Sequence, residues 1–161
     1  MILWNTADGR RLHVLNDHIR GVQDLAIDPM SLEDGEHLPT VFSAGSDRTI
    51  RPFTLTVDGK SPRVSEPIIE HETSVYKLFF DGDGDLWTAS ADKTARCLDR
   101  ESGWKTDLTL DHPDFVKDVV IDERHGWVIT ACRDEEVRIW SRAVSETCPI
   151  HPRAFRARLT N

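Results

Sequence analysis

Long apolar runs, an excess of basic charge and a secretory signal are all missing from this sequence. No stretch approaches the ~20 consecutive apolar residues that a bilayer-spanning helix needs, which excludes a membrane protein of that kind. Met1–Asn5 shows no basic region followed by an apolar core, so we expect no secretory signal there. Acidic residues number 28 against 20 basic ones, and a net charge of −8 disfavours nucleic acid as a partner, because phosphate binding needs basic charge.

A cysteine framework is missing as well. Cys97, Cys132 and Cys148 are odd in number, and their spacing fits neither a disulfide scaffold nor a zinc site. We therefore expect reduced thiols and a cytoplasmic or nuclear location. A length of 161 residues suits one domain, and 39% apolar with 30% charged residues is the balance of a globular chain. These properties exclude a secreted disulfide scaffold, but they name no function.

What the sequence does contain is a unit that recurs three times. Each unit has a histidine, an apolar stretch, and then Ser or Thr followed by Ala and, three residues later, Asp. The units hold His18 with Ser43–Asp47, His71 with Thr88–Asp92, and His112 with Thr130–Asp134. Their period is roughly 40 residues, the length of a four-stranded propeller blade. The first interval is longer because Met30–His37 and Asp58–Pro62 supply polar insertions.

Each unit has the composition of β-strands separated by turns. Trp127–Ile129 is rich in residues that favour strands, and Val137 and Ile139 alternate with Arg138. Turn-forming residues such as Asp81–Gly84 separate the apolar stretches. No window shows a clean helical stripe, so the sequence predicts an all-β fold.

The order of these features resembles the WD40 repeat, most closely in Asp134–Trp140. Ile2–Trp4 is similar to the end of a preceding repeat. The resemblance implies a WD40-type β-propeller segment over residues 1–150, with repeats at about 10–57, 64–101 and 104–142. Residues 151–161 contain three arginines and no acid, and we expect a basic C-terminal tail or the stub of a further repeat.

The strands add up to two, then four, four and four, with the outer strand of the last set near Cys148–Ile150. This gives about three and a half four-stranded blades, which is an incomplete ring because closed propellers have 4–8. Two blade faces would stay uncovered, and exposed apolar faces invite association. We expect a piece of a longer propeller completed by further chain, self-association with a second copy, or a truncated product.

In WD40 blades a buried hydrogen-bonded tetrad joins Asp, His, Ser or Thr, and Trp, and the resemblance carries it over to ten residues here. These are His18, Ser43 and Asp47; His71, Thr88 and Asp92; and His112, Thr130, Asp134 and Trp140. Only the third set is complete, because Phe53 and Leu98 stand in the Trp position and cannot donate an N–H. A hydrolase triad occurs once in an enzyme, so three repeats of Ser/Thr, His and Asp indicate a structural role.

Asp81–Asp85 has the alternating carboxylates that calcium prefers. Leu86 stands where a calcium loop needs Gly, and strands rather than helices flank it, so a hairpin turn is the preferred interpretation. We predict no metal and no cofactor. A propeller-based enzyme or calcium-binding module remains an alternative.

In WD40 propellers the residues beside the Val after the His, and the residue before the tetrad Asp, commonly contact partners. Here the resemblance selects Gln23, Ser46, Tyr76, Phe115, Lys117 and Arg133. The function it implies is a non-catalytic protein-interaction scaffold that presents these loop residues to a protein or peptide. The overall charge favours a partner with a basic segment. A truncated fragment with a purely structural role is a further alternative. Trp104, in a loop after Ser102 and Gly103, is the tryptophan we expect to be exposed.

Overall fold

The computed structural model describes residues 1–32, 39–56, 61–142 and, for the backbone alone, 155–157. Within these ranges the regular structure is β-strand, apart from one short 3-10 turn, η1 (Pro29–Leu32). No helix in the described ranges is long and apolar enough to cross a membrane. The all-β prediction is therefore confirmed.

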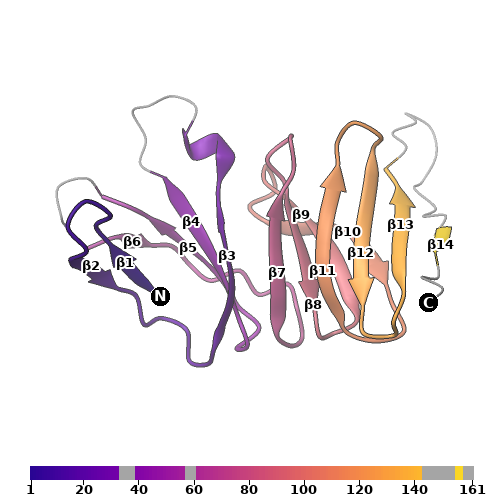
Figure 1. The fold of residues 1–161 in the computed structure, drawn as a ribbon, viewed down its shortest axis with the longest axis horizontal. Helices are drawn as coiled ribbons and strands as arrows, with labels where there is room; N and C mark the ends of the chain where they lie inside the picture. Colours follow the sequence, from indigo (N-terminus) through magenta and orange to yellow (C-terminus); the bar gives the residue numbers. More distant parts are fainter. Residues whose placement is uncertain (33–38, 57–60, 143–154, 158–161) are drawn as a thin grey trace.

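Four antiparallel sheets stand side by side (Figure 1). A half-blade pairs β1 (Ile2–Trp4) with β2 (Arg11–Val14). The first blade has the order β3 (Val22–Ile27), β4 (Thr40–Gly45), β5 (Ile50–Thr54) and β6 (Arg63–Val64). The second has β7 (Val75–Phe80), β8 (Leu86–Ser90), β9 (Thr94–Asp99) and β10 (Lys105–Asp111). The third has β11 (Val116–Asp122), β12 (Trp127–Cys132), β13 (Val137–Ser141) and β14 (Phe155–Ala157).

Two strands followed by three sets of four is the arrangement that the repeat pattern predicts, and it is confirmed. The half-blade and the third blade stand at opposite ends of the row, so the sheets form a partial, open propeller (Figure 1). In every full blade the first strand is followed by its neighbours in chain order. Short hairpin connections of this kind follow from antiparallel pairing.

The outer strand of the third blade lies later in the chain than we expected. β14 pairs with β13 in the register Val137↔Ala157 to Ile139↔Phe155. It falls within 151–161, which we expected to be a basic tail or stub, while Cys148–Ile150 lies outside the described residues. The edge of β13 offers unpaired backbone groups to any extended segment, so pairing there does not depend on an apolar pattern. The arginines around Phe155 concealed this strand.

The core consists of two layers, one on each side of the second blade. Between the first and second blades, Phe42, Ile50 and Leu86 are fully buried. Between the second and third, Trp87 and Val119 are equally buried. All five residues of β8 are buried, because that strand has a blade on both of its faces. The second blade is therefore the best-packed part of the molecule.

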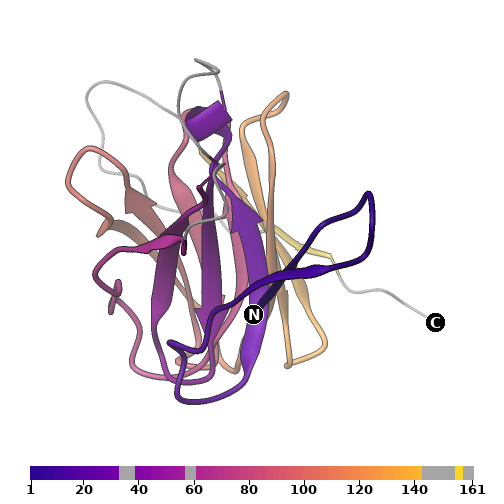
Figure 2. The ribbon, with the colours of Figure 1, turned by 90° about the vertical axis from the view of Figure 1, so that its left-hand side faces the viewer.

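The half-blade packs much less tightly. Its hairpin projects sideways from the row of sheets in Figure 2, and Trp4 is 54% exposed. On the first blade, Leu25 and Ile27 of β3 are 49% and 56% exposed. Apolar side chains at alternate positions of an inner strand are typical of a face that another sheet covers.

The innermost strand of every full blade has the same irregularity. The pairing register shifts between Val22 and Asp24 in β3, at the corresponding place in β7, and again in β11. Each shift leaves one residue opposite no partner, which is a β-bulge. The bulged residues are Gln23, Tyr76 and Lys117. A bulge bends the strand and changes the direction of its side chain.

Candidate functional site

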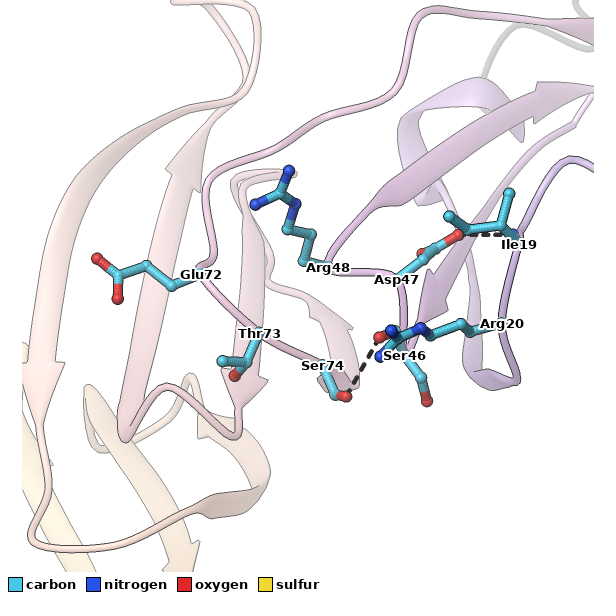
Figure 3. A pocket seen from close by; sticks show the side chains of 8 residues that line it. All are labelled: Ile19, Arg20, Ser46, Asp47, Arg48, Glu72, Thr73 and Ser74. Carbon is cyan, nitrogen blue, oxygen red and sulfur yellow. Dashed lines mark hydrogen bonds between the residues drawn. The ribbon is translucent and has the colours of Figure 1, made fainter.

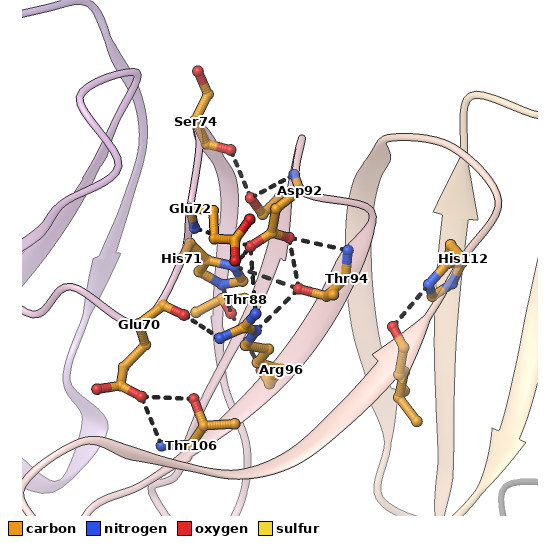
Figure 4. Close-up of polar contacts among 12 residues, drawn as sticks. Glu70, His71, Glu72, Ser74, Thr88, Asp92, Thr94, Arg96, Thr106 and His112 are labelled. Atoms are coloured by element: carbon orange, nitrogen blue, oxygen red, sulfur yellow. Dashed lines mark hydrogen bonds and ion pairs between the residues drawn. The ribbon is translucent and has the colours of Figure 1, made fainter.

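The first two blades hold their histidines in the same way. In the first blade, Nδ1 of His18 donates to Asp47 at 2.9 Å and Nε2 lies 2.7 Å from Oγ of Ser43. In the second, His71 makes the equivalent contacts with Asp92 at 2.8 Å and Thr88 at 2.6 Å (Figure 4). Three residues from separate segments of each blade are joined in this way without an indole.

A threonine two positions after each of these aspartates completes both networks. Oγ1 of Thr49 donates to Asp47 at 2.8 Å, and Oγ1 of Thr94 donates to Asp92 at 2.6 Å. Burial opposes ionisation of Asp47, but hydrogen bonds from Thr49 and His18 outweigh it and lower its pKa to about 2. Burial is likewise outweighed at Asp92, whose pKa is lowered by His71 and Thr94. Both carboxylates are therefore held in their charged form.

The third blade departs from the expected complete tetrad. Nε1 of Trp140 donates to Oγ1 of Thr130 at 2.9 Å, and His112 Nε2 lies 2.7 Å from the same oxygen. Nδ1 of His112, however, donates to the carbonyl of Leu110 at 3.0 Å (Figure 4). Asp134 binds the guanidinium of Arg138 instead, at 3.1 Å from Nη1. The structure thus joins three members of the predicted set and places the fourth elsewhere.

Glu136 gives a physical reason for this departure. It occupies the position of Thr49 and Thr94, and its carboxylate lies 2.7 Å from Nη2 of Arg138. Two carboxylates therefore bind one guanidinium. The hydrogen bond from Arg138 is the main cause of the lowered pKa of Asp134. Burial lowers the pKa of His112, which lacks the carboxylate bond of the other histidines.

One end of the blades gathers the residues that we predicted to contact a partner, and we call it the turn face. It comprises residues 20–23, 46–48, 74–76, 91–93, 115–117 and 133–135. Three equivalent backbone bonds assemble it: Ser46 N donates to Gly21 O at 2.8 Å, Ala91 N to Ser74 O at 3.0 Å, and Arg133 N to Phe115 O at 2.8 Å. Each bond places the turn after a second strand beside the start of an inner strand.

Four of the predicted contact residues form a stack across two blades. Nζ of Lys117 lies 3.8 Å from the centroid of the Tyr76 ring and 5.7 Å from that of Phe115. The guanidinium of Arg133 lies 5.4 Å from the Phe115 centroid. Cations over aromatic faces are attracted by the ring quadrupole. The stack therefore holds two aromatic rings and two cations in fixed positions at the surface.

The other two predicted contact residues meet on the first blade. Nε2 of Gln23 donates to Oγ of Ser46 at 2.7 Å. Ser74 of the second blade donates to the backbone oxygen of Ser46 at 3.4 Å. The turn face is thus continuous from the first blade to the third, and all six predicted contact residues lie on it.

The expected exposure of Trp104 is wrong. Its ring packs edge-on against Phe42 of the first blade and Phe80 of the second, at centroid separations of 5.0 and 6.0 Å. The guanidinium of Arg100 covers it at 4.9 Å. A loop residue can be drawn into the junction between two blades, and nothing local in the sequence reveals that junction.

The acidic turn Asp81–Asp85 is a hairpin turn in the structure. Oδ1 of Asp81 accepts from the backbone N–H groups of Asp83 and Asp85, and Oδ2 accepts from Nε1 of Trp87 and Nη1 of Arg142. Although Asp81, Asp85 and Cys97 offer ligand atoms within 4.8 Å of one another, Asp81 already accepts four hydrogen bonds. These residues do not fit a calcium site.

Sequence reasoning missed two arginines of the turn face, Arg20 and Arg48. Together with Ser46 and Ser74 they line a pocket between the first and second blades (Figure 3). The sequence did contain a signal for Arg48. The residue directly after the tetrad aspartate is charged in all three repeats, as Arg48, Lys93 and Glu135. All three have a positive φ, of 64°, 70° and 67°. Their side chains begin from a left-handed turn at the edge of the face.

Comparisons with known proteins agree with this architecture. Residues 104–141 match the family described as WD domain, G-beta repeat. The chain is 32% identical over 155 residues to an uncharacterised WD repeat-containing protein of Schizosaccharomyces pombe. The alignment covers 94% of this chain and 40% of that relative, so the chain spans about 40% of the length of the curated relative it matches.

Proposed function

Because this chain is a partial member of the WD40 repeat family, whose members are generally protein-interaction scaffolds, we propose that it is a non-catalytic module whose turn face binds a protein or peptide. The stack of Tyr76, Lys117, Phe115 and Arg133 carries this proposal. Aromatic residues and arginine dominate the energy of protein interfaces. Here they are positioned before any partner arrives, which reduces the entropy lost on binding.

Contacts between blades support a rigid presentation of the turn face. Arg142 of the third blade binds Asp81 at 3.0 Å and Asp83 at 2.8 Å on the second. Arg100 of the second blade forms an ion pair with Asp28 of the first. These bridges join the blades at the end away from the turn face, and the buried histidine networks hold its turns.

The burial of the repeated hydroxyls supports a non-catalytic role. Ser43, Thr88 and Thr130 are each 0% exposed, so a substrate cannot reach them as nucleophiles. A propeller-based enzyme would need another reactive group. The free thiols of Cys97 and Cys132 are buried, and burial raises the pKa of Cys97 to about 12, which suppresses its thiolate. Two free thiols also favour the cytosol or the nucleus as the location.

The open faces belong to the same proposal. Leu25 and Ile27 on β3 would be covered by further propeller chain or by a second copy. The repeat boundaries 10–57, 64–101 and 104–142 remain part of the proposal, and the family match over 104–141 supports the last.

The test is a quantitative pull-down with the immobilised chain, comparing the wild type with a Tyr76→Ala, Phe115→Ala, Arg133→Ala triple variant. We expect specific partners to be depleted at least about tenfold, because interface anchors of these types carry most of the binding energy. A control with Trp4→Ala, Arg124→Ala and Trp127→Ala makes comparable changes at exposed sites outside the turn face and should retain them. An unchanged partner set in the triple variant, with an unchanged melting temperature, would contradict the proposal.

A further inference from the structure

A pocket of about 340 Å³ opens on the turn face between the first and second blades (Figure 3). Its walls are formed by Ile19, Arg20, Ser46, Asp47, Arg48, Glu72, Thr73 and Ser74. The segment before β3 and the turn after β4 supply one side, and the segment before β7 supplies the other. Both sides are held together by the bond from Ser74 Oγ to the Ser46 carbonyl.

The pocket carries two cations. Arg20 and Arg48 are both exposed, and within the described residues neither forms an ion pair. Figure 3 shows both guanidinium groups beside the pocket. An arginine stays protonated at all physiological pH values. The two side chains therefore bring positive charge that no ion pair among the described residues neutralises.

The acidic residues of the pocket do not cancel this charge. The carboxylate of Asp47 lies inside its blade network, where it accepts hydrogen bonds from His18, Thr49 and the backbone of Ile19. The Glu72 side chain extends to the opposite side in Figure 3, away from both guanidinium groups. A ligand in the pocket would thus meet the arginines before it met an available carboxylate.

Hydroxyl groups add donors to the same space. Oγ of Ser46 accepts from Gln23 and keeps its own proton to donate. Thr73 lies on the facing wall. Guanidinium and hydroxyl donors around one pocket are the groups that bind a carboxylate, because arginine presents its donors in the geometry of two carboxylate oxygens.

We propose that this pocket accepts the carboxylate of an aspartate or glutamate from an acidic peptide segment of the partner. The inference rests on the proposed function and names the chemistry of the partner. Ser74 lies in the pocket and Tyr76 follows it by two residues, roughly 7 Å along an extended chain. A peptide can therefore continue from the pocket to the cations of Lys117 and Arg133.

The local charge of the turn face outweighs the overall charge of the chain in this choice. The net charge of −8 favours a basic partner, but interactions between exposed charges more than about 8 Å apart are largely screened at physiological salt. Among the charged residues that line the pocket, Arg20, Arg48 and Glu72 form no ion pair with the described residues, and the Glu72 carboxylate points away from the two guanidinium groups in Figure 3. The structure thus points to the opposite sign from the one that composition suggests.

The experiment is a titration of the full ¹⁵N-labelled chain with three blocked octapeptides that alternate Glu, Gln or Lys with Gly and Ser. We expect the Glu peptide to shift the amide signals of Gly21, Ser46 and Ser74 and to bind at least about tenfold more tightly than the Gln peptide. The combined Arg20→Gln and Arg48→Gln variant should weaken it by about tenfold, since two exposed charge pairs are lost. Raising the salt concentration should weaken the wild type more than this variant.

Arg124→Gln is the matched control, because it removes the same charge from an exposed turn at the other end of the third blade. It should bind the Glu peptide as the wild type does. The proposal is overturned if the Glu peptide leaves the pocket amides unshifted at millimolar concentration, or if the Gln or Lys peptide shifts them equally. If this happens while the Tyr76, Phe115 and Arg133 triple variant still loses its partners, the proposed function stands and only the acidic chemistry fails.

Discussion

The second and third blades hold equivalent histidines by opposite means. In the second, His71 bonds the charged Asp92, and Leu98, which cannot donate an N–H, occupies the position of the indole. In the third, His112 bonds the carbonyl of Leu110 and shares Thr130 with Trp140. The second blade therefore depends on a buried hydrogen bond to a charged carboxylate, and the third on neutral hydrogen bonds and a ring contact at 5.3 Å.

The difference shows that a motif can keep its residues and change its bonding. Asp134 is present in the third blade. Glu136, however, stands where the other two blades have a threonine, so Arg138 binds two carboxylates. In the second blade the equivalent Arg96 lies 3.6 Å from Asp92 and donates from Nε to Thr94 at 3.0 Å. We infer that one residue outside the tetrad, Glu136, determines whether the aspartate belongs to it.

The largest expected effect comes from removing the histidines themselves. His71→Ala removes a hydrogen bond to the charged carboxylate of Asp92 together with the buried bond to Thr88, and we expect the free energy of unfolding to fall by about 3–5 kcal/mol. His112→Ala removes only neutral bonds and should cost about 1–3 kcal/mol. Urea unfolding followed by circular dichroism measures both, with His125→Ala as an exposed control. Equal losses at 71 and 112 would remove the distinction between the blades.

A smaller effect is expected from Trp140→Phe, which keeps an aromatic ring beside His112 and deletes the bond to Thr130. The loss should be about 1–2 kcal/mol, the value of one buried hydrogen bond with its desolvated acceptor. The same unfolding measurement applies. Trp127→Phe, on a ring that is 40% exposed, is the control and should change stability little. A Trp140 variant as stable as the wild type would show that the indole bond contributes nothing.

Glu136→Thr tests the cause of the difference directly. With a threonine in place, Asp134 should turn from Arg138 to His112, as Asp92 does to His71. A neighbouring carboxylate favours the charged imidazole, so the pKa of His112 should rise. Titration of its ring protons by NMR measures this, and Glu101→Thr, on an exposed turn, is the control. An unchanged His112 titration in the Thr variant would assign the displacement of Asp134 to something other than Glu136.

The smallest effect is a two-stage loss of stability with acid. Burial lowers the pKa of His112 below 6.5, so the unfolded chain binds more protons there and stability falls as the pH drops below about 6.5. Asp47 and Asp92 have lowered pKa values, so their contribution is present above about 3.8 and is lost as the pH falls through the folded values, about 2 for Asp47. Melting temperatures from pH 8 to pH 2 should show both stages. His112→Gln should remove the upper one alone, and its persistence in that variant would refute the assignment.

The arrangement of the blades could be predicted from the sequence because the repeat is a local pattern. His18 and Asp47 flank the first two strands of their repeat, and the structure places their side chains 2.9 Å apart. The same repeat spacing predicted two strands followed by three sets of four strands. The selection of Tyr76 and Lys117 followed from the resemblance, while the bulges that aim them are backbone features that residue types do not reveal.

The features that the sequence did not reveal depend on competition with groups outside the motif and on contacts between blades. Whether Asp134 binds His112 or Arg138 is decided by charge balance around Glu136, not by the motif. The partial burial of Trp104 requires the first and second blades to meet, because its ring packs against Phe42 and Phe80. Arg20 is recognised as part of a pocket only once the segment containing Ser74 lies opposite it.

The repeated bulge has a consequence for how such a module can diversify. Gln23, Tyr76 and Lys117 each lie outside the strand pairing, so exchanging them leaves every ladder hydrogen bond in place. If the turn face binds a partner as proposed, substitutions at these three positions should change binding while the strand pairing is kept. During evolution, the fold of the inner strands can be conserved while these surface residues vary. A library randomised at positions 23, 76 and 117 would test the same tolerance in the laboratory.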